Sequence, residues 1–295
     1  MPGMDVHFDS RVLEAFTAER FEEHEACLRC PSPRKAAEWF EELLGLLVPE
    51  RSTRRYGSVD ELRAHLQDLR ARLAALLAAA DPGARAAAER TADAFVTVLP
   101  ELHSHIKEDV IAIDRGDPAA TSASEVARTY PGVFAVAAYR VAHALQRLGV
   151  PLLPRILSAH AHGATGIDIH PAARIGRHFC IDHGTGVVIG ATAVIGDRVK
   201  IYQGVTLGGL SVRKEDAAIK RHPTIEDDVV IYAGATILGG DTVIGRGSVI
   251  GGNVWVTTSV PPGSRLSYRV NGSVHRTGAE DGSAEEGVVV QGGLP

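Results

Sequence analysis

Aliphatic residues recur at a six-residue step through the second half of the chain. The longest unbroken run consists of Ile225, Ile231, Ile237, Val243, Val249 and Trp255. An earlier run consists of Ile169, Ile175 and Ile181 and, after a two-residue slip, Ile189, Ile195, Ile201 and Leu207. A step of six fits neither an α-helix nor the alternation of a simple strand. It predicts coils with three short flat faces that share an aliphatic core, so we expect a parallel β-helix from about 167 to 262.

The first half of the chain is patterned as helices instead. Ser58 and Glu61 form a capping box ahead of a stretch of strong helix formers. Breaks are expected at 81–83, Pro100 and 130–132. Further helices are expected at about 84–99, 101–114 and 133–148. The sequence therefore predicts an α+β chain in which an N-terminal helical domain is followed by hexapeptide repeats.

The two patterns suggest a division of the chain into three parts. We expect a helical domain at 1–162, a β-helix domain at 163–263 and a mobile, Gly-, Ser- and Glu-rich tail at 264–295. The repeat fails twice, at the slip around 182–186 and between Gly209 and Arg221. Breaks in a repeat usually map to loops on one face, and that face is often the working one.

Composition narrows the functional classes. The net charge of −5, with no basic cluster, gives no reason to expect binding to nucleic acid or to a membrane surface. The sequence shows neither a signal peptide nor a run of apolar residues long enough to span a membrane. Of three cysteines, Cys27 and Cys30 form a single CxxC, which without further ligands predicts no metal site. These features favour a soluble protein of the reducing cytoplasm.

Histidines and carboxylates gather where the repeat fails. Asp168 precedes the first break by about one coil, and Asp182 and His183 lie within it. A carboxylate beside a histidine fixes its tautomer and stabilises the imidazolium, so His183 is a candidate general base. Arg221 and His222 close the second break. A guanidinium binds a carboxylate through two parallel hydrogen bonds, so Arg221 suggests a substrate that carries a carboxylate.

Several segments together resemble the serine O-acetyltransferases, the hexapeptide-repeat family that opens cysteine biosynthesis. The matching segments are 109–119 (DVIAIDRGDPA), 139–143 (YRVAH), 168–176 (DIHPAARIG), 182–186 (DHGTG), 205–209 (VTLGG) and 221–223 (RHP). The similarity covers about half of the chain, from about 109 to 263. It implies a left-handed parallel β-helix, a homotrimer or a dimer of trimers, and transfer of an acetyl group from acetyl-CoA to the hydroxyl of L-serine.

The resemblance also implies residue roles. The implied catalytic residues are His183 as general base, Asp168 orienting it and His222 acting beside it. The implied substrate contacts are Asp117 and Asp182 to the amino group, and Arg221, with His222, to the carboxylate. The implied acetyl-CoA contacts are Gly208, Gly209, Ala233 and Gly234, in a groove between neighbouring subunits. No metal is implied.

The chain departs from the family in two places. Its loop at 210–220 is a few residues longer and is charged, which affects the acetyl-CoA contacts. It ends in Gly-Gly-Leu-Pro, whereas family members insert a C-terminal isoleucine into O-acetylserine sulfhydrylase, so docking by that route is not expected.

Three alternatives stay open on the same scaffold. One is an acetyltransferase for another hydroxyl acceptor, such as a sugar. Another is a zinc-dependent carbonic anhydrase, for which His170, His183 and His222 are the available ligands. The third is an inactive scaffold that only assembles trimers.

Overall fold

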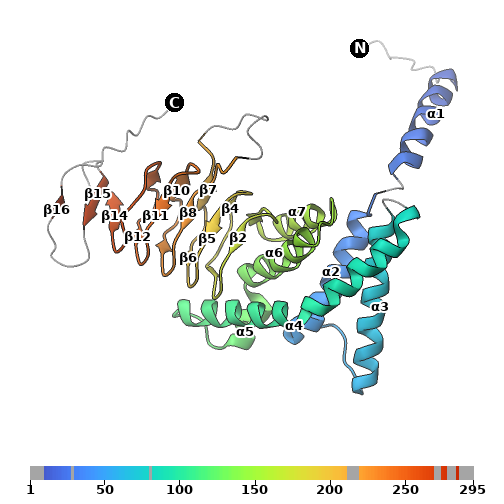
Figure 1. The fold of residues 1–295 in the computed structure, drawn as a ribbon, viewed down its shortest axis with the longest axis horizontal. Helices are drawn as coiled ribbons and strands as arrows, with labels where there is room; N and C mark the ends of the chain where they lie inside the picture. The colour runs from blue at the N-terminus through green and yellow to red at the C-terminus, as the bar shows by residue number, and fades with distance from the viewer. Residues whose placement is uncertain are drawn as a thin grey trace, which may run out of the picture.

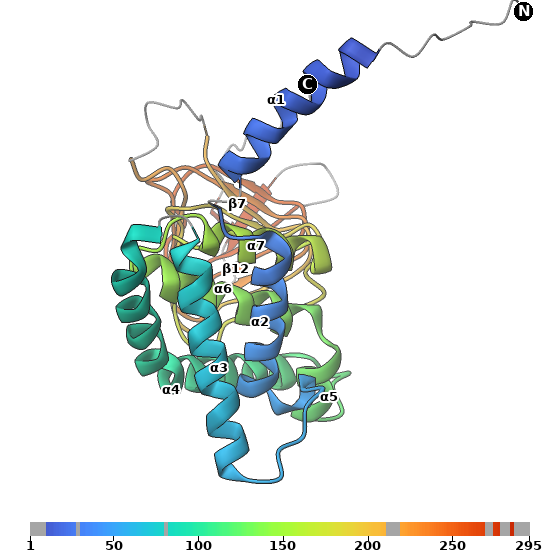
Figure 2. The same cartoon turned by 90° about the vertical axis from the view of Figure 1, so that its right-hand side faces the viewer.

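The computed structural model describes residues 10–27, 30–79, 82–210, 219–268, 274–277 and 284–285. Its α-helices are α1 (Ser10–Cys27), α2 (Pro33–Leu47), α3 (Val59–Ala78), α4 (Arg85–Gly116), α5 (Ala123–Thr129), α6 (Pro131–Arg147) and α7 (Leu153–Thr165). Two short 3-10 helices, η1 (Pro49–Arg51) and η2 (Pro82–Ala84), connect them. Helices α2, α3 and α4 lie side by side at one end of the molecule, and α1 projects away from it (Figures 1 and 2).

The helix cap predicted at Ser58 is confirmed. Ser58 Oγ accepts a hydrogen bond from the backbone N–H of Glu61 at 3.2 Å, and α3 begins at Val59. Ser122 caps α5 in the same way, through the N–H of Glu125. These side chains satisfy backbone donors that have no partner inside the first turn of a helix.

The predicted break at Pro100 is wrong. Helix α4 runs without interruption through Pro100, and no separate helices end and begin there. A proline inside a helix removes one backbone hydrogen bond, yet burial compensates for this loss. Phe95 and Leu99 before the proline and Leu102 and Ile106 after it are all buried on one face, while the proline is exposed. The predicted turn at 130–132 is also shorter than expected, since α6 begins at Pro131.

The second half is a left-handed parallel β-helix, as predicted. Its short strands are β1 (Asp168–Ile169), β2 (Arg174–Ile175), β3 (Cys180–Ile181), β4 (Val188–Ile189), β5 (Val194–Ile195), β6 (Lys200–Ile201), β7 (Thr206–Gly208), β8 (Thr224–Ile225), β9 (Val230–Ile231), β10 (Thr236–Leu238), β11 (Val243–Ile244), β12 (Val249–Ile250) and β13 (Trp255–Val256). They stack as three faces: sheet A with β1, β4, β7, β10 and β13, sheet B with β2, β5, β8 and β11, and sheet C with β3, β6, β9 and β12. Figure 1 shows these coils stacked outward from the helices.

The inward column is confirmed over most of the helix but shifts by one residue near its end. Ile244, Ile250 and Val256 pair with Ile225, Ile231 and Ile237 of the preceding coil and are buried. The expected inward residues of this last coil were Val243, Val249 and Trp255, and Trp255 is in fact 46% exposed. One extra residue between β10 and β11 causes the shift. Two adjacent apolar residues satisfy the spacing equally well, so only strand pairing decides which of them faces inward.

Strand pairing continues beyond the predicted end of the repeat at 263. Strand β14 (Arg265–Tyr268) adds to sheet C beside β12, and β15 (Val274–Thr277) and β16 (Ala284–Glu285) follow it antiparallel. The rest of the predicted mobile tail, with Val288–Val290 and the C-terminal Gly-Gly-Leu-Pro, lies outside the described residues, as do 211–218 of the charged loop. The change from helices to strands falls between Thr165 and Asp168. Its use as a domain boundary stays a prediction.

Helix α6 holds the first coil through three side chains of the YRVAH segment. The Tyr139 hydroxyl donates to the carbonyl of Ala173 at 2.7 Å, and His143 Nδ1 bonds the carbonyl of Pro171 at 2.8 Å. Arg140 donates to the carbonyl of Gly176 at 2.6 Å and forms two 3.0 Å bonds to the carboxylate of Asp109 on α4. This buried pair fixes α4, α6 and the first coil to one another.

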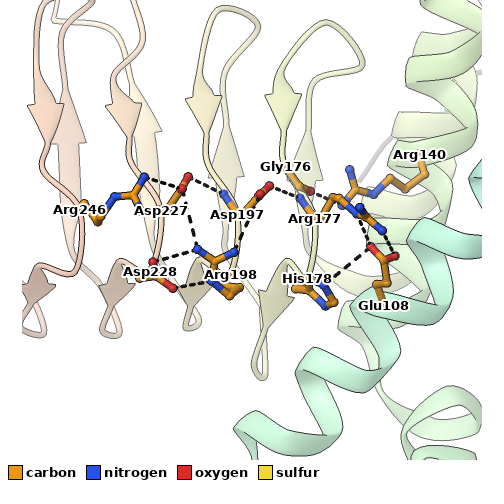
Figure 3. A network of polar contacts seen from close by, with 10 residues as sticks. All are labelled: Glu108, Arg140, Gly176, Arg177, His178, Asp197, Arg198, Asp227, Asp228 and Arg246. Atoms are coloured by element: carbon orange, nitrogen blue, oxygen red, sulfur yellow. Dashed lines mark hydrogen bonds and ion pairs between the residues drawn. The ribbon is translucent and has the colours of Figure 1, made fainter.

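A second set of polar contacts between the helices and the β-helix lies at the outer corner between sheets B and C (Figure 3). Glu108 of α4 binds Arg177 of the first coil, and the backbone N–H of Arg177 donates to Asp197 one coil further on. The N–H of Asp197 in turn donates to Asp227, which binds Arg246. These contacts are largely exposed, so each adds little free energy, but together they link successive coils.

Candidate active site

The first break of the repeat forms a corner between sheets C and A, named here the His183 corner (residues 182–187). His183 is the second residue after β3 and has a φ of 58°, a left-handed conformation that is rare for residues other than glycine. Its side chain is 72% exposed, and its Nε2 lies 3.8 Å from Oδ1 of the buried Asp182. The imidazole is therefore presented to solvent with a carboxylate behind it, as a general base requires.

Asp117 reaches this corner from the helical part of the chain. It lies at the C-terminal end of α4, where its Oδ2 accepts a 2.5 Å hydrogen bond from the Tyr130 hydroxyl and its Oδ1 accepts one from the N–H of Ala119. These bonds hold the pKa of Asp117 below its usual range, and nearby Lys200 and His183 lower it further. The same bond raises the pKa of Tyr130 to about 12. Asp117 is thus an ionised carboxylate close to His183.

Close packing between α6 and the first coil of the β-helix fixes the position of Tyr130. Gly132, in the first turn of α6, lies against the backbone of Ile181 in β3. A Cβ atom at position 132 would lie 2.3 Å from the carbonyl oxygen of Ile181, so only glycine fits there. The sequence marked Tyr130 to Gly132 as a turn and gave no hint of this contact.

Lys200 is a further member of the corner that the sequence did not reveal. Its Nζ lies 3.0 Å from Oδ2 of Asp182 and donates a 2.6 Å hydrogen bond to the carbonyl of Gly116. Lysine at this position looks like any outward-facing residue of a strand. Only the stacking of β6 on β3 and the approach of α4 bring it to two partners that are distant in sequence.

His222 lies at a different corner, between sheets A and B, named here the His222 corner (His170, Thr192 and His222). Its Nδ1 accepts hydrogen bonds from the backbone N–H of Thr192 at 3.1 Å and from the Thr192 hydroxyl at 2.8 Å. That hydroxyl oxygen accepts from the N–H groups of Arg221 and His222, so its own hydrogen points to Nδ1. Nε2 therefore carries the proton of the neutral ring.

Burial, aided by the charge of Arg221, lowers the pKa of His222 to about 4. The ring is neutral near pH 7 and offers Nε2–H as a hydrogen-bond donor. The ring packs against Gly190, where a Cβ atom would come within 1.9 Å of it. Gly190 and Thr192 are thus supporting residues that the hexad pattern alone did not distinguish from other corner residues.

His170 belongs to the same corner. Its Nδ1 accepts from the N–H of Ala172 at 3.0 Å, and burial, together with the charge of Arg155, lowers its pKa. Asp168, which was expected to orient His183, begins β1 in sheet A. Within one chain, and for these two described residues, no hydrogen bond or ion pair joins Asp168 to His183.

The chain therefore brings the predicted site residues together in two groups. Asp117, Asp182 and His183 meet at one edge of sheet A, whereas Arg221 and His222 lie at its other edge. His222 was expected to act beside His183, yet sheet A separates them within one chain.

The predicted acetyl-CoA contacts are divided in the same way. Ala233 and Gly234 precede β10 on the edge that carries the His183 corner, and Gly234 has a φ of 72°. Gly234 stacks on Gly204 of the preceding coil, and the side chain of Asn253 from the following coil lies against it. Gly208 ends β7 on the opposite edge, and Gly209 follows it.

No group of three or more His, Cys, Asp or Glu side chains arranged to hold a metal ion occurs among the described residues. Across those residues, no helix is both long and apolar enough to cross a membrane.

Comparison with known proteins places these features in a family. No family model matches the chain. A plasmid-encoded serine acetyltransferase of Synechococcus elongatus is 58% identical over 61% of this chain and 58% of its own length. The chain thus spans less than two thirds of that relative. The serine acetyltransferase of Staphylococcus xylosus is 48% identical over 53% of this chain and 70% of the relative.

A solved structure agrees with the sequence comparisons. Serine acetyltransferase isoform 3 of Entamoeba histolytica, in complex with cysteine, matches with a TM-score of 0.69 and 40% identity over 76% of this chain and 78% of that one. On these matches, the chain belongs to the serine acetyltransferase family.

Proposed function

We propose that this protein transfers the acetyl group of acetyl-CoA to the hydroxyl of L-serine, giving O-acetyl-L-serine and CoA. The observation that carries the proposal is the meeting of Asp117 and Asp182 beside His183. Two carboxylates from different parts of the chain suit a substrate ammonium group, and the exposed imidazole next to them suits a hydroxyl on the neighbouring carbon. A neutral sugar has no ammonium group to pair with these two carboxylates.

In the proposed reaction His183 removes the proton of the serine hydroxyl as its oxygen attacks the thioester carbon of acetyl-CoA. The tetrahedral intermediate then collapses, the carbon–sulfur bond breaks, and the imidazolium of His183 returns the proton to the leaving thiolate. A positioned base contributes roughly 10²–10⁴-fold to such a step. Backbone N–H groups near Gly208 and Gly209 are proposed to stabilise the oxyanion.

His222 and Arg221 are proposed to complete the site from a neighbouring subunit. The two groups of residues lie at opposite edges of sheet A within one chain, and a trimer that packs one edge against the other joins them. The neutral His222 then donates its Nε2–H to the reacting oxygen, while Arg221 binds the substrate carboxylate. Acetyl-CoA is proposed to occupy the groove between subunits, along Ala233 and Gly234.

An acetyl-CoA assay that follows the release of free thiol tests the proposal. We expect turnover with L-serine and none above background with sugars. O-acetyl-L-serine identified by mass spectrometry as the product would support the assignment. Turnover with a sugar but not with L-serine would overturn it in favour of another acceptor.

A further inference from the structure

The environment of Lys200 is unusual for a lysine in an exposed face of a β-helix. Its side chain is only 15% exposed, and its Nζ lies 4.5 Å from the centre of the Tyr202 ring. The Asp182 carboxylate and the Gly116 carbonyl are its other two partners. An ammonium group has three N–H donors, which equals the number of these acceptors.

One polar partner of Lys200 belongs to the β-helix and the other to the helical part of the chain. Asp182 follows β3 of the β-helix, and Gly116 is the last residue of α4, one residue before Asp117. Lys200 therefore contacts Asp182 directly and also contacts the backbone carbonyl of Gly116, just before Asp117. No second basic side chain joins Asp182 to α4 among the described residues.

The contact with Lys200 also fixes how the Asp182 carboxylate is turned. Lys200 binds Oδ2, while Oδ1 faces Nε2 of His183 at 3.8 Å. An ionised carboxylate accepts hydrogen bonds at both oxygens, so Oδ1 keeps its capacity for a ligand. Burial lowers the pKa of Lys200, but the bonds to Tyr202 and Asp182 outweigh burial and raise it overall, so the cation is permanent.

From this geometry we infer that Lys200 is a positioning residue for the amino-group subsite. It fixes the distance between Asp117 and Asp182 and turns Oδ1 of Asp182 toward the substrate ammonium. The inference rests on the proposed function. Lys200 does not touch the reacting atoms, so its loss affects the binding of serine more than the chemical step. A purely structural lysine would give no such preference.

The test measures KM and kcat for both substrates in Lys200→Met, in Lys200→Gln, which keeps neutral donors, and in Lys200→Arg. Loss of a charge-assisted contact predicts a KM for L-serine raised about tenfold or more, with the KM for acetyl-CoA changed by less than about twofold. Lys200→Arg restores most of the serine affinity. Lys107→Met, on the exposed surface of α4, serves as the matched control and leaves both constants unchanged.

The outcomes are distinct. An unchanged or lower KM for serine in the Met and Gln variants, or equal rises for both substrates, overturns the inference. Circular dichroism of each variant shows whether the fold is intact, and Lys200→Gln replaces the Met variant if the latter does not fold. If the wild-type protein does not acetylate serine at all, the proposed function fails, a result that is separate from these.

Discussion

The hydroxyl of Thr192 lies 2.8 Å from Nδ1 of His222, and the backbone N–H of Thr192 lies 3.1 Å from the same nitrogen. Both contacts donate to the ring, so they fix the tautomer that carries its proton on Nε2. His222 is thereby fixed to the preceding coil. Three of the following predictions concern groups held in this way by neighbours that are distant in sequence.

Stability should depend on pH through His222. Its folded pKa is about 4, whereas an unfolded histidine titrates near about 6.5. Between these values the unfolded chain binds more protons, so the free energy of unfolding falls as the pH is lowered from about 6.5 to about 4. Urea denaturation of the wild type and of His222→Gln across this range checks the effect. A shallower slope is expected for the variant, and identical slopes would contradict the assignment.

Gly190→Ala should displace the His222 ring. The new methyl group would lie within 1.9 Å of the ring in the present arrangement, so the ring must move. We expect kcat for serine acetylation to fall by about tenfold or more, because small misplacements of reacting groups are costly. Gly163→Ala in α7, where a Cβ atom meets nothing within 4 Å, is the control and should retain full activity. Equal activities of the two variants would refute the packing argument.

Arg140→Met should destabilise the fold strongly. It leaves the buried carboxylate of Asp109 without its partner, and breaking a buried ion pair costs about 3–5 kcal/mol. Arg177→Met removes a pair whose arginine is exposed, for which about 0–1 kcal/mol is expected. Chemical denaturation of both variants gives the comparison. Similar losses in the two would show that burial does not set the cost here.

His183→Ala should abolish most of the activity while leaving the fold intact. The side chain is exposed, so its removal creates no cavity, and general-base catalysis accounts for roughly 10²–10⁴-fold in rate. Steady-state kinetics give the loss in kcat, and thermal melting shows that stability is kept. Full activity in this variant would contradict the assignment of His183 as the general base.

Much of the fold was accessible from the sequence because the hexad pattern and the helix caps are local signals. Ser58 caps α3 as predicted, and the aliphatic column from Ile169 to Ile237 faces inward as predicted. Where two neighbouring residues are both apolar, as at Trp255 and Val256, spacing gives no preference, and pairing with the previous coil decides. The break predicted at Pro100 was wrong for a related reason, because burial of a long apolar face outweighs a local helix-breaking tendency.

The same distinction between local signals and long-range packing applies to the candidate site. The sequence by itself determined the scaffold and the chemically capable residues at its breaks, since Asp182, His183, Arg221 and His222 lie next to interruptions that can be read directly. Only the tertiary structure decided which groups meet. Lys200 approaches Asp182 because β6 stacks on β3. Asp117 reaches the same corner because α4 packs against β3, a contact between segments more than 60 residues apart along the chain. Such proximity follows from long-range packing, which leaves no periodic trace in the sequence.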